Sequence, residues 1–207
     1  MPEIRLSIAE QRISTKRIND VIPEKGLKIF FGIGGSRDTK RWPAEHFANL
    51  ARTILKQFDA QFVFTLVPGD SEWVENFKKY FLNDHEAAKR LHFFKDLTLR
   101  EAAGVISKCD YYVGNDSSLK HIAIAFDLPT FTFFGPEEPL EWHPYHISHH
   151  PYAFIKNLEC RTESGKHWCT ISSCVKHKHQ CLAGIVPESV LPIILSQCEK
   201  IQDIKLK

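Results

Sequence analysis

Three segments of the chain combine small residues with polar or charged side chains, and each lies between a short apolar run and a stretch with helical periodicity. They are residues 34–40 (GGSRDTK), 68–72 (PGDSE) and 114–118 (GNDSS). In a parallel sheet, loops of this kind gather outside the carboxyl ends of the strands, where open α/β proteins bind their ligands. We therefore expect the three loops to form one binding site.

The third loop has the composition of an anion site. Small polar residues at the start of a helix leave backbone N–H groups free, and the helix dipole favours a negative charge there. A phosphate or pyrophosphate is the expected ligand. Asp116 allows another interpretation, in which its carboxylate only caps the helix. His121 lies one turn beyond Ser118 on the same helix face, so it is either close to the anion or purely structural.

The other two loops add a cation and a carboxylate. Gly34 and Gly35 allow a ligand to approach the backbone closely, and Lys40 offers a point charge for a phosphate, although a solvated basic turn would look the same. Glu72 can accept hydrogen bonds from ribose hydroxyls or can occupy a helix first turn, where acids are favoured. No loop carries a Walker or G-x-G-x-x-G fingerprint, which disfavours P-loop NTPases and dehydrogenases that use that fingerprint.

Strands and helices alternate along the first two thirds of the chain. The apolar runs predict strands at 28–33, 61–67, 91–94, 111–114 and 129–134, and helical spacing predicts helices at 43–58, 71–82, 98–109 and 119–126. Short loops between such elements imply right-handed βαβ units. The sequence therefore predicts an α/β fold, a Rossmann-like parallel sheet with helices on both faces.

We expect three parts along the chain. Residues 1–26 form a polar lead-in with some helix near residues 8–18 and no role in the core, and residues 27–145 form the Rossmann-like domain. Residues 146–207 form His- and Cys-rich loops and a docking helix near 187–198. Pro192 inside that helix predicts a kink or a later start.

The third part raises the question of a metal site. The cysteines and histidines in question are Cys160, Cys169, Cys174, Cys181, His167, His177 and His179. The cysteines lack the paired C-x2-C spacing of common structural zinc sites. Free thiols are the favoured interpretation, a zinc-dependent binding protein is a minor alternative, and the histidines at 143–150 are expected in a solvated or acceptor-facing loop. We therefore expect no metal.

Composition narrows the classes of function. The chain has 207 residues, of which 43% are hydrophobic and 25% charged, as in ordinary globular proteins. A net charge of +2 is small for a protein that depends on phosphate contacts with nucleic acid, so no nucleic-acid partner is expected. No apolar run is long enough for a transmembrane helix, and the first residues lack the apolar segment of a secretory signal. We expect a cytoplasmic protein.

Three motifs taken together resemble glycosyltransferase family 9, which is best known from ADP-heptose:lipopolysaccharide heptosyltransferases. Residues 34–47 (GGSRDTKRWPAEHF) resemble its small-residue loop followed by Lys-x-Trp-Pro, residues 115–123 (NDSSLKHIA) its Asn-Asp-Ser/Thr-Gly-x-x-His-x-Ala, and residues 134–139 (FGPEEP) its Phe-Gly-Pro-Thr-x-Pro. The resemblance covers roughly residues 28–145. Ser118 stands where the family usually has Gly, and Glu137 where Thr is usual.

The resemblance implies a metal-independent, inverting enzyme of the GT-B fold, in which two Rossmann-like domains face each other across a cleft and the C-terminal one holds a nucleotide-sugar donor. Lys40 would neutralise the diphosphate, Glu72 would hold the ribose and Asp116 would bind sugar hydroxyls. The donor-binding residues implied in this way are Gly35, Ser36, Lys40, Glu72, Asp116, Ser117, Ser118, Leu119 and His121. In that frame residues 1–26 resemble a former interdomain linker.

The acceptor side follows from the same resemblance. No residue of this chain matches the family's general base, so we expect no catalytic residue here. An ADP-sugar donor would serve a lipopolysaccharide core acceptor through a missing N-terminal domain or a partner chain, peripherally at the inner face of the inner membrane. The alternative is a non-catalytic nucleotide-sugar-binding or interaction module. Exposed apolar surface at Phe134, Trp142 and residues 187–198 would favour a homo-oligomer or partner binding.

Overall fold

A single parallel sheet organises the chain. The computed structural model describes residues 2–66, 71–161, 173–174 and 178–206. Within them, six strands lie in the order β3-β2-β1-β4-β5-β6, and every neighbouring pair is parallel. The strands are β1 Leu27–Gly32, β2 Ala60–Thr65, β3 Leu91–Phe94, β4 Tyr111–Asn115, β5 Thr130–Phe133 and β6 Tyr152–Ala153. The predicted Rossmann-like sheet and its five expected strands are confirmed.

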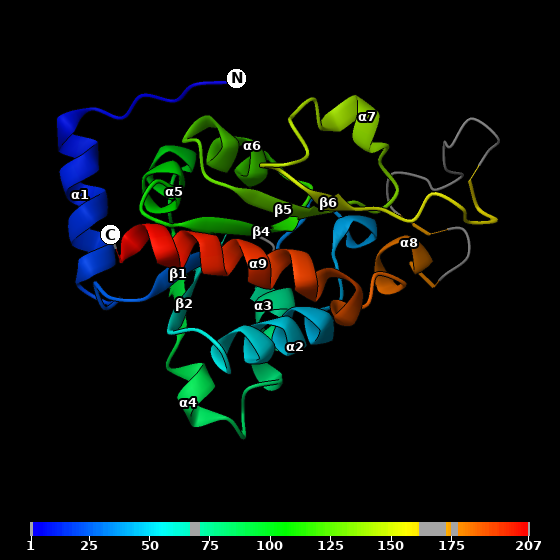
Figure 1. Ribbon diagram of the computed structural model, residues 1–207, viewed down its shortest axis with the longest axis horizontal. Helices are drawn as coiled ribbons and strands as arrows, with labels where there is room; N and C mark the ends of the chain where they lie inside the picture. The colour runs from blue at the N-terminus through cyan, green and yellow to red at the C-terminus, as the bar shows by residue number, and fades with distance from the viewer. Residues whose placement is uncertain (1, 67–70, 162–172, 175–177, 207) are drawn as a thin grey trace.

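Helices cover both faces of the sheet. They are α1 Ile8–Asn19, the 3-10 turn η1 Asp38–Lys40, α2 Ala44–Leu55, α3 Ser71–Lys79, α4 His85–Ala88, α5 Leu99–Ile106, α6 Ser118–Ala125, α7 Pro139–Trp142, α8 Gln180–Ala183 and α9 Pro187–Lys205. Helices α2, α3 and α9 pack on one face, and Figure 1 shows α9 crossing it. Helices α1, α5 and α6 pack on the other.

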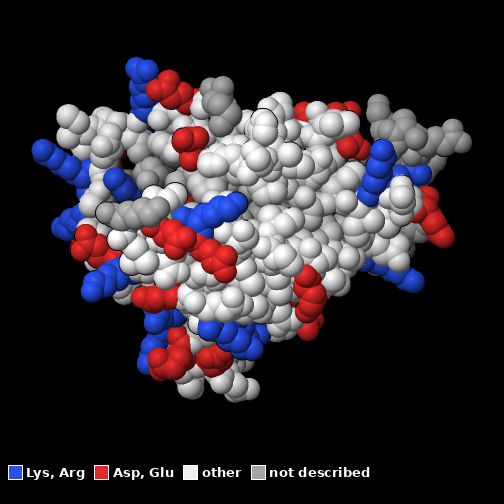
Figure 2. All heavy atoms as spheres, viewed as in Figure 1, with Lys and Arg blue, Asp and Glu red and all other residues white. Residues whose placement is uncertain are grey.

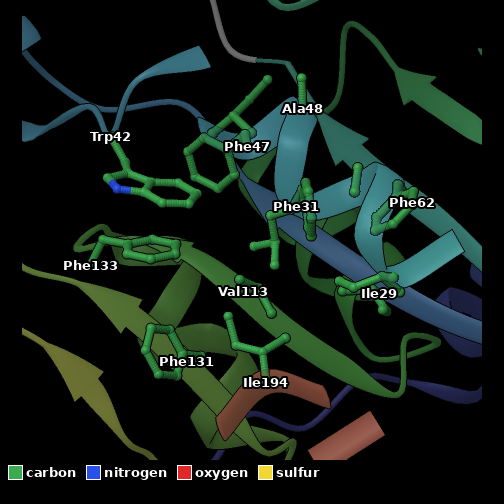
Figure 3. Packing of buried hydrophobic residues seen from close by; sticks show 14 of the residues in the cluster. Ile29, Phe31, Trp42, Phe47, Ala48, Phe62, Val113, Phe131, Phe133 and Ile194 are labelled. Atoms are coloured by element: carbon green, nitrogen blue, oxygen red, sulfur yellow. The ribbon is translucent and has the colours of Figure 1, made fainter. Parts of the chain in front are cut away.

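The four central strands, β2, β1, β4 and β5, bury both of their faces, which is why they appear as apolar runs in the sequence. In β1, Ile29 and Phe31 join the core beneath α2 and α9, whereas Phe30 between them faces α5 and α6. The Phe31 ring lies 4.5 Å from that of Phe62 in the neighbouring strand. Figure 3 shows this aromatic cluster extending to Trp42.

Helix α9 runs from Pro187 to Lys205 without a break, so the expected later start at Pro192 is wrong. Pro187 occupies its first turn, where the missing N–H costs nothing. Pro192 lies on the exposed side. The buried stripe of Val190, Ile194 and Cys198 packs into the core on the opposite side, and this packing outweighs the one backbone hydrogen bond that Pro192 cannot donate.

Both terminal parts contribute more to the fold than expected. The helix predicted near residues 8–18 is present as α1, but Ile18 and the following Ile22 are buried against α5, so this segment is part of the core. The third part adds β6, whose Tyr152 and Ala153 pair with β5. A two-residue strand is too short to leave a periodic pattern in the sequence. Residues beyond 145 therefore extend the sheet rather than forming only loops and a docking helix.

Phe134 is fully buried, contrary to the expectation that it is exposed. Its ring meets those of His143 and Tyr152 edge-on. His143 and His150 are buried as well, so they do not belong to a solvated loop: His143 Nε2 lies 2.7 Å from the His150 carbonyl oxygen, and His150 Nδ1 lies 3.1 Å from Thr130 Oγ1. These histidines are structural.

The proposed metal ligands are only partly within the described residues. Cys169, His167 and His177 lie outside them. Among the described residues, no three His, Cys, Asp or Glu side chains come together as a metal site would require, and Cys160 carries a free thiol. None of the helices among the residues that the structure describes has the length and apolar character needed to span a membrane.

On the face of the molecule that Figure 2 shows, charged side chains of both signs lie next to one another, mainly toward its edges, and a broad central area carries none. The mixing of signs agrees with the small net charge of +2.

Candidate functional site

An open cavity of about 740 Å³ lies at the carboxyl ends of β1 and β4. From β1 the chain passes through α2 to β2 on one side, and from β4 it passes through α6 to β5 on the other. Because the two connections leave in opposite directions, a crevice opens between them, and open α/β sheets bind ligands at this point. The cavity therefore has the expected position of a ligand site.

The structure brings almost all of the predicted site residues together. The cavity is lined by Gly35, Ser36, Lys40, Asp116, Ser117, Ser118, Leu119 and His121 from the prediction, and also by Gly34, Arg41, Leu99 and Trp142. Glu72 is the exception among the described residues. It lies exposed in the first turn of α3, which follows β2, and is not part of the cavity lining.

Asn115 fixes the glycine loop that follows β1. Its side-chain amide donates to the carbonyl oxygens of Ile33 and Gly34 at 2.9 and 3.0 Å, and its Oδ1 accepts from the Trp42 backbone N–H at 2.9 Å. Asn115 is fully buried, so all of these bonds are made away from water. Asn115 thus connects the end of β4 to the segment that follows β1, a role that its position in the sequence does not reveal.

Two glycines allow β1 and β4 to approach at the floor of the cavity. Gly32 and Gly114 are paired in register, and a Cβ at Gly114 would lie 2.6 Å from Gly32 Cα. A Cβ at Gly32 would overlap the Tyr112 hydroxyl. That hydroxyl donates to the Asn115 carbonyl at 2.9 Å. Glycine is needed at both positions for steric reasons.

Trp42 holds the segment that carries Lys40. Its indole is buried and stacks on Phe133, with ring centroids 3.9 Å apart (Figure 3). The indole N–H donates to the Ile185 carbonyl at 2.7 Å, which ties the loop to the chain just before α9. Since η1 ends at Lys40, two residues before Trp42, this anchor fixes the start of the Lys40 side chain.

The N-terminus of α6 faces the cavity without a side-chain cap. Helices α1 and α5 both begin with a complete capping box, built on Ser7 and Thr98. At α6 the N-cap residue is Ser117, and among the described residues its side chain makes no capping hydrogen bond. The interpretation that Asp116 caps the helix is therefore wrong. Without such a cap, the first amides of α6 are available to an anion.

Asp116 is instead the centre of a network of charges. Its Oδ1 lies 2.6 Å from Lys120 Nζ, and its Oδ2 lies 3.3 Å from Lys40 Nζ. Lys40 also lies 3.3 Å from Glu137 Oε1, and Glu137 pairs with Arg37. Three cations and two carboxylates leave one positive charge in excess. An anion is therefore favoured in the cavity.

Sequence reasoning did not assign Lys120, which is the most deeply buried charge of the site. Its side chain is fully buried, donates to the Trp142 carbonyl at 3.1 Å and lies over the Phe134 ring at 4.7 Å. Burial lowers its pKa, and the Asp116 carboxylate opposes that shift. The available signal was the i,i+4 spacing from Asp116, which is typical of helical ion pairs.

His121 is a neutral group at the cavity wall. Its Nδ1 lies 2.6 Å from the Tyr145 hydroxyl. Burial first, and then the charge of Lys120, lower the pKa of His121 to about 4. At neutral pH it therefore acts as a hydrogen-bonding group and adds no positive charge.

The fold is the Rossmann-like fold found in GT-B glycosyltransferases, which are structural neighbours of this chain. The family model for glycosyltransferase family 9 (heptosyltransferase) matches residues 1–167, and the chain belongs to this family. The resemblance found in the sequence is confirmed.

Relatives and solved structures agree with this membership. Lipopolysaccharide heptosyltransferase 2 of Salmonella typhimurium is 31% identical over 152 residues, which are 73% of this chain and 41% of that protein. The structure of Escherichia coli ADP-heptose LPS heptosyltransferase II matches with a TM-score of 0.73 at 23% identity and covers 97% of this chain and 54% of that one.

A more distant neighbour was solved in complex with ADP-D-beta-D-heptose. It is the dodecameric, iron-containing heptosyltransferase TibC, with a TM-score of 0.61 at 12% identity over 87% of this chain and 47% of that one. At such identities the match supports the fold alone. The chain spans about half the length of the relatives that it matches.

Proposed function

We propose that this chain is the donor-binding part of a family 9 glycosyltransferase and holds a nucleoside diphosphate sugar in the cavity at the ends of β1 and β4. The observation that carries the proposal is the position of Lys40. Its ammonium group lines the cavity that the uncapped N-terminus of α6 also faces. A lysine charge and free helix amides are the two features that a diphosphate requires.

The remaining residues divide the donor between them. The amides of Ser117, Ser118 and Leu119 bind phosphate oxygens, and Gly35 and Ser36 let the diphosphate approach the loop after β1. Asp116, which follows the neighbouring strand β4, accepts hydrogen bonds from sugar hydroxyls. His121 lies beside the phosphates as a neutral donor or acceptor.

Glu72 belongs to the nucleoside end of the donor. It follows β2, next to β1 in the sheet, and it is exposed and carries a carboxylate suited to two ribose hydroxyls. This role places the nucleoside beyond the cavity described here, on the β2 side.

ADP-heptose is the proposed donor, because the matched relatives are named as heptosyltransferases and one solved neighbour holds an ADP-heptose. The corresponding reaction is transfer of the sugar to a lipopolysaccharide core. A part of the enzyme outside this chain contributes the general base. Because Lys40 neutralises charge on the diphosphate, we propose that the transfer is metal-independent. We place the protein in the cytoplasm, in peripheral contact with the inner face of the inner membrane.

Calorimetric titration with ADP tests the proposal. Lys40→Ala removes one charge-assisted contact worth about 1.5–3 kcal/mol, so the dissociation constant should rise roughly 10- to 100-fold. Asp116 keeps Lys120 as a partner, so the variant should remain folded. Lys89→Ala, a change of the same charge at an exposed site after α4, is the matched control and should bind like the wild type.

Two results would contradict the proposal. One is a folded wild-type chain that does not bind ADP at millimolar concentration. The other is equal loss of affinity in Lys40→Ala and Lys89→Ala, since a general charge effect and not a site contact would then govern binding.

A further inference from the structure

Trp142 is an aromatic side chain at the cavity, beside the residues proposed to bind the diphosphate. It ends α7, lines the cavity and is 49% exposed. Exposed tryptophan costs hydrophobic free energy that a ligand could recover by covering it. Leu140, on the same short helix, is more exposed still but does not line the cavity among the described residues.

The backbone of Trp142 is fixed to the charge network of the site. Its carbonyl oxygen accepts from Lys120 Nζ at 3.1 Å, and the same ammonium binds Asp116 Oδ1 at 2.6 Å. The indole ring centroid lies 5.8 Å from Lys40 Nζ. Lys120 therefore ties the backbone of Trp142 to the Asp116 carboxylate, and both the indole and the carboxylate lie beside the cation proposed for the diphosphate.

The order of the strands shows which end of a donor Trp142 meets. Along the edge of the sheet, Glu72 follows β2, the Lys40 loop follows β1, Asp116 follows β4 and Trp142 follows β5. A donor laid across this edge with its ribose at Glu72 and its diphosphate at Lys40 places its sugar beyond Lys40. That position lies between Asp116 and Trp142.

We propose that the Trp142 indole packs against the ring of the donor sugar while Asp116 binds its hydroxyls, which makes Trp142 a specificity-determining residue for the sugar. The inference rests on the proposed function. A pyranose presents C–H groups on its faces and hydroxyls around its edge. An aromatic surface beside a carboxylate is complementary to both.

The test compares two ligands in the same calorimetric titration, ADP and ADP-heptose. Trp142→Ala should raise the dissociation constant of ADP-heptose about five- to tenfold, from the loss of an aromatic contact and its buried area, and should leave that of ADP within twofold. Trp142→Phe should restore most of the affinity for ADP-heptose. Leu140→Ala is the matched control on α7 and should change neither constant.

A second variant tests the anchor. Lys120→Met keeps an unbranched side chain of similar length but cannot donate to the Trp142 carbonyl or to Asp116. Lys120 is a positioning residue, so Lys120→Met should weaken the binding of ADP-heptose more than the binding of ADP. The ratio of the ADP dissociation constant to the ADP-heptose dissociation constant should therefore fall. In a chain that already carries Trp142→Ala, Lys120→Met should lower this ratio by less than it does in the wild type.

The outcomes separate the two proposals. If the wild type binds neither ligand, the donor-site proposal fails and this inference with it. If the wild type binds ADP and Lys40→Ala weakens it, but Trp142→Ala weakens both ligands equally or neither, the donor site stands and the role of Trp142 is refuted. An equal loss would mean that the indole contacts the nucleotide.

Discussion

The Asp116–Lys120 pair provides the most direct test of the charge network. Lys120 is fully buried and the Asp116 side chain is 7% exposed, with 2.6 Å between them. At this distance and an effective dielectric constant of about 20, the direct attraction is about 6 kcal/mol. Asp116→Asn removes it and leaves Lys120 with the Trp142 carbonyl and the Phe134 ring.

The expected loss in free energy of unfolding is about 3–5 kcal/mol, the usual result of leaving one member of a buried pair without its partner. That loss is a large share of the roughly 5–15 kcal/mol of a typical domain. Replacing both partners removes the buried charge altogether. Asp116→Asn with Lys120→Met should therefore recover most of the stability that Asp116→Asn loses.

Stability also depends on pH in a defined direction. Burial lowers the pKa of Lys120 in the folded state, and Asp116 opposes this shift, so Asp116→Asn lowers that pKa further. Between the lowered value and the ordinary lysine value the unfolded chain binds more protons, and the free energy of unfolding rises with pH. The penalty of Asp116→Asn should therefore be smaller at pH 10 than at pH 7.

Urea denaturation followed by circular dichroism measures these free energies of unfolding. The proteins compared are the wild type, both single variants and the double variant, each at pH 7 and pH 10. A loss below about 1 kcal/mol for Asp116→Asn at pH 7 would show that the pair is not a buried interaction of this strength. The reasoning would also be refuted if the double variant were no more stable than Asp116→Asn.

Three further predictions concern the surrounding fold. Burial lowers the pKa of His121 and His150 to about 4, so the unfolded chain binds more protons below the ordinary histidine value. The free energy of unfolding should fall from about pH 6.5 to pH 4, and urea titrations of a His150→Gln variant should show a flatter profile. Gly32→Ala should destabilise the chain by about 1–3 kcal/mol through overlap with the Tyr112 hydroxyl; Tyr112→Phe in that background should relieve part of the loss, and full stability of Gly32→Ala would contradict the packing. Trp42→Phe should cost about 2–4 kcal/mol, because it opens a void and leaves a buried carbonyl without its donor; thermal and urea midpoints check this, and an unchanged midpoint would exclude the indole as an anchor.

Most of the fold could be read from local patterns. The five longer strands and the helices between them appear in the sequence as apolar runs and helical spacing, because each element buries a face of its own residues. Two features could not be read. Strand β6 has only two residues, and the continuity of α9 past Pro192 depends on the core that receives Ile194 and Cys198.

Site residues that follow the ends of strands could be predicted from the sequence, whereas residues whose roles depend on contacts between separate segments were missed. Loops after β1 and β4 meet at one edge in any parallel sheet, so the grouping of Lys40 with Asp116 follows from the fold class. Lys120, Glu137 and Trp142 were not assigned as site residues. Their roles depend on contacts that the spacing of residues does not reveal, such as Lys120 with the Trp142 carbonyl, 22 residues apart, and Arg37 with Glu137, 100 residues apart.

The sequence by itself determined the α/β class, the family and eight of the residues that line the cavity, because periodicity and motif spacing are properties of neighbouring residues. The tertiary structure decided that Asp116 is a partner of two lysines and not a helix cap, that Phe134 is buried, and that the exposed Trp142 lies at the cavity. Burial and charge pairing act over a few ångströms. Only the folded chain fixes which side chains come that close.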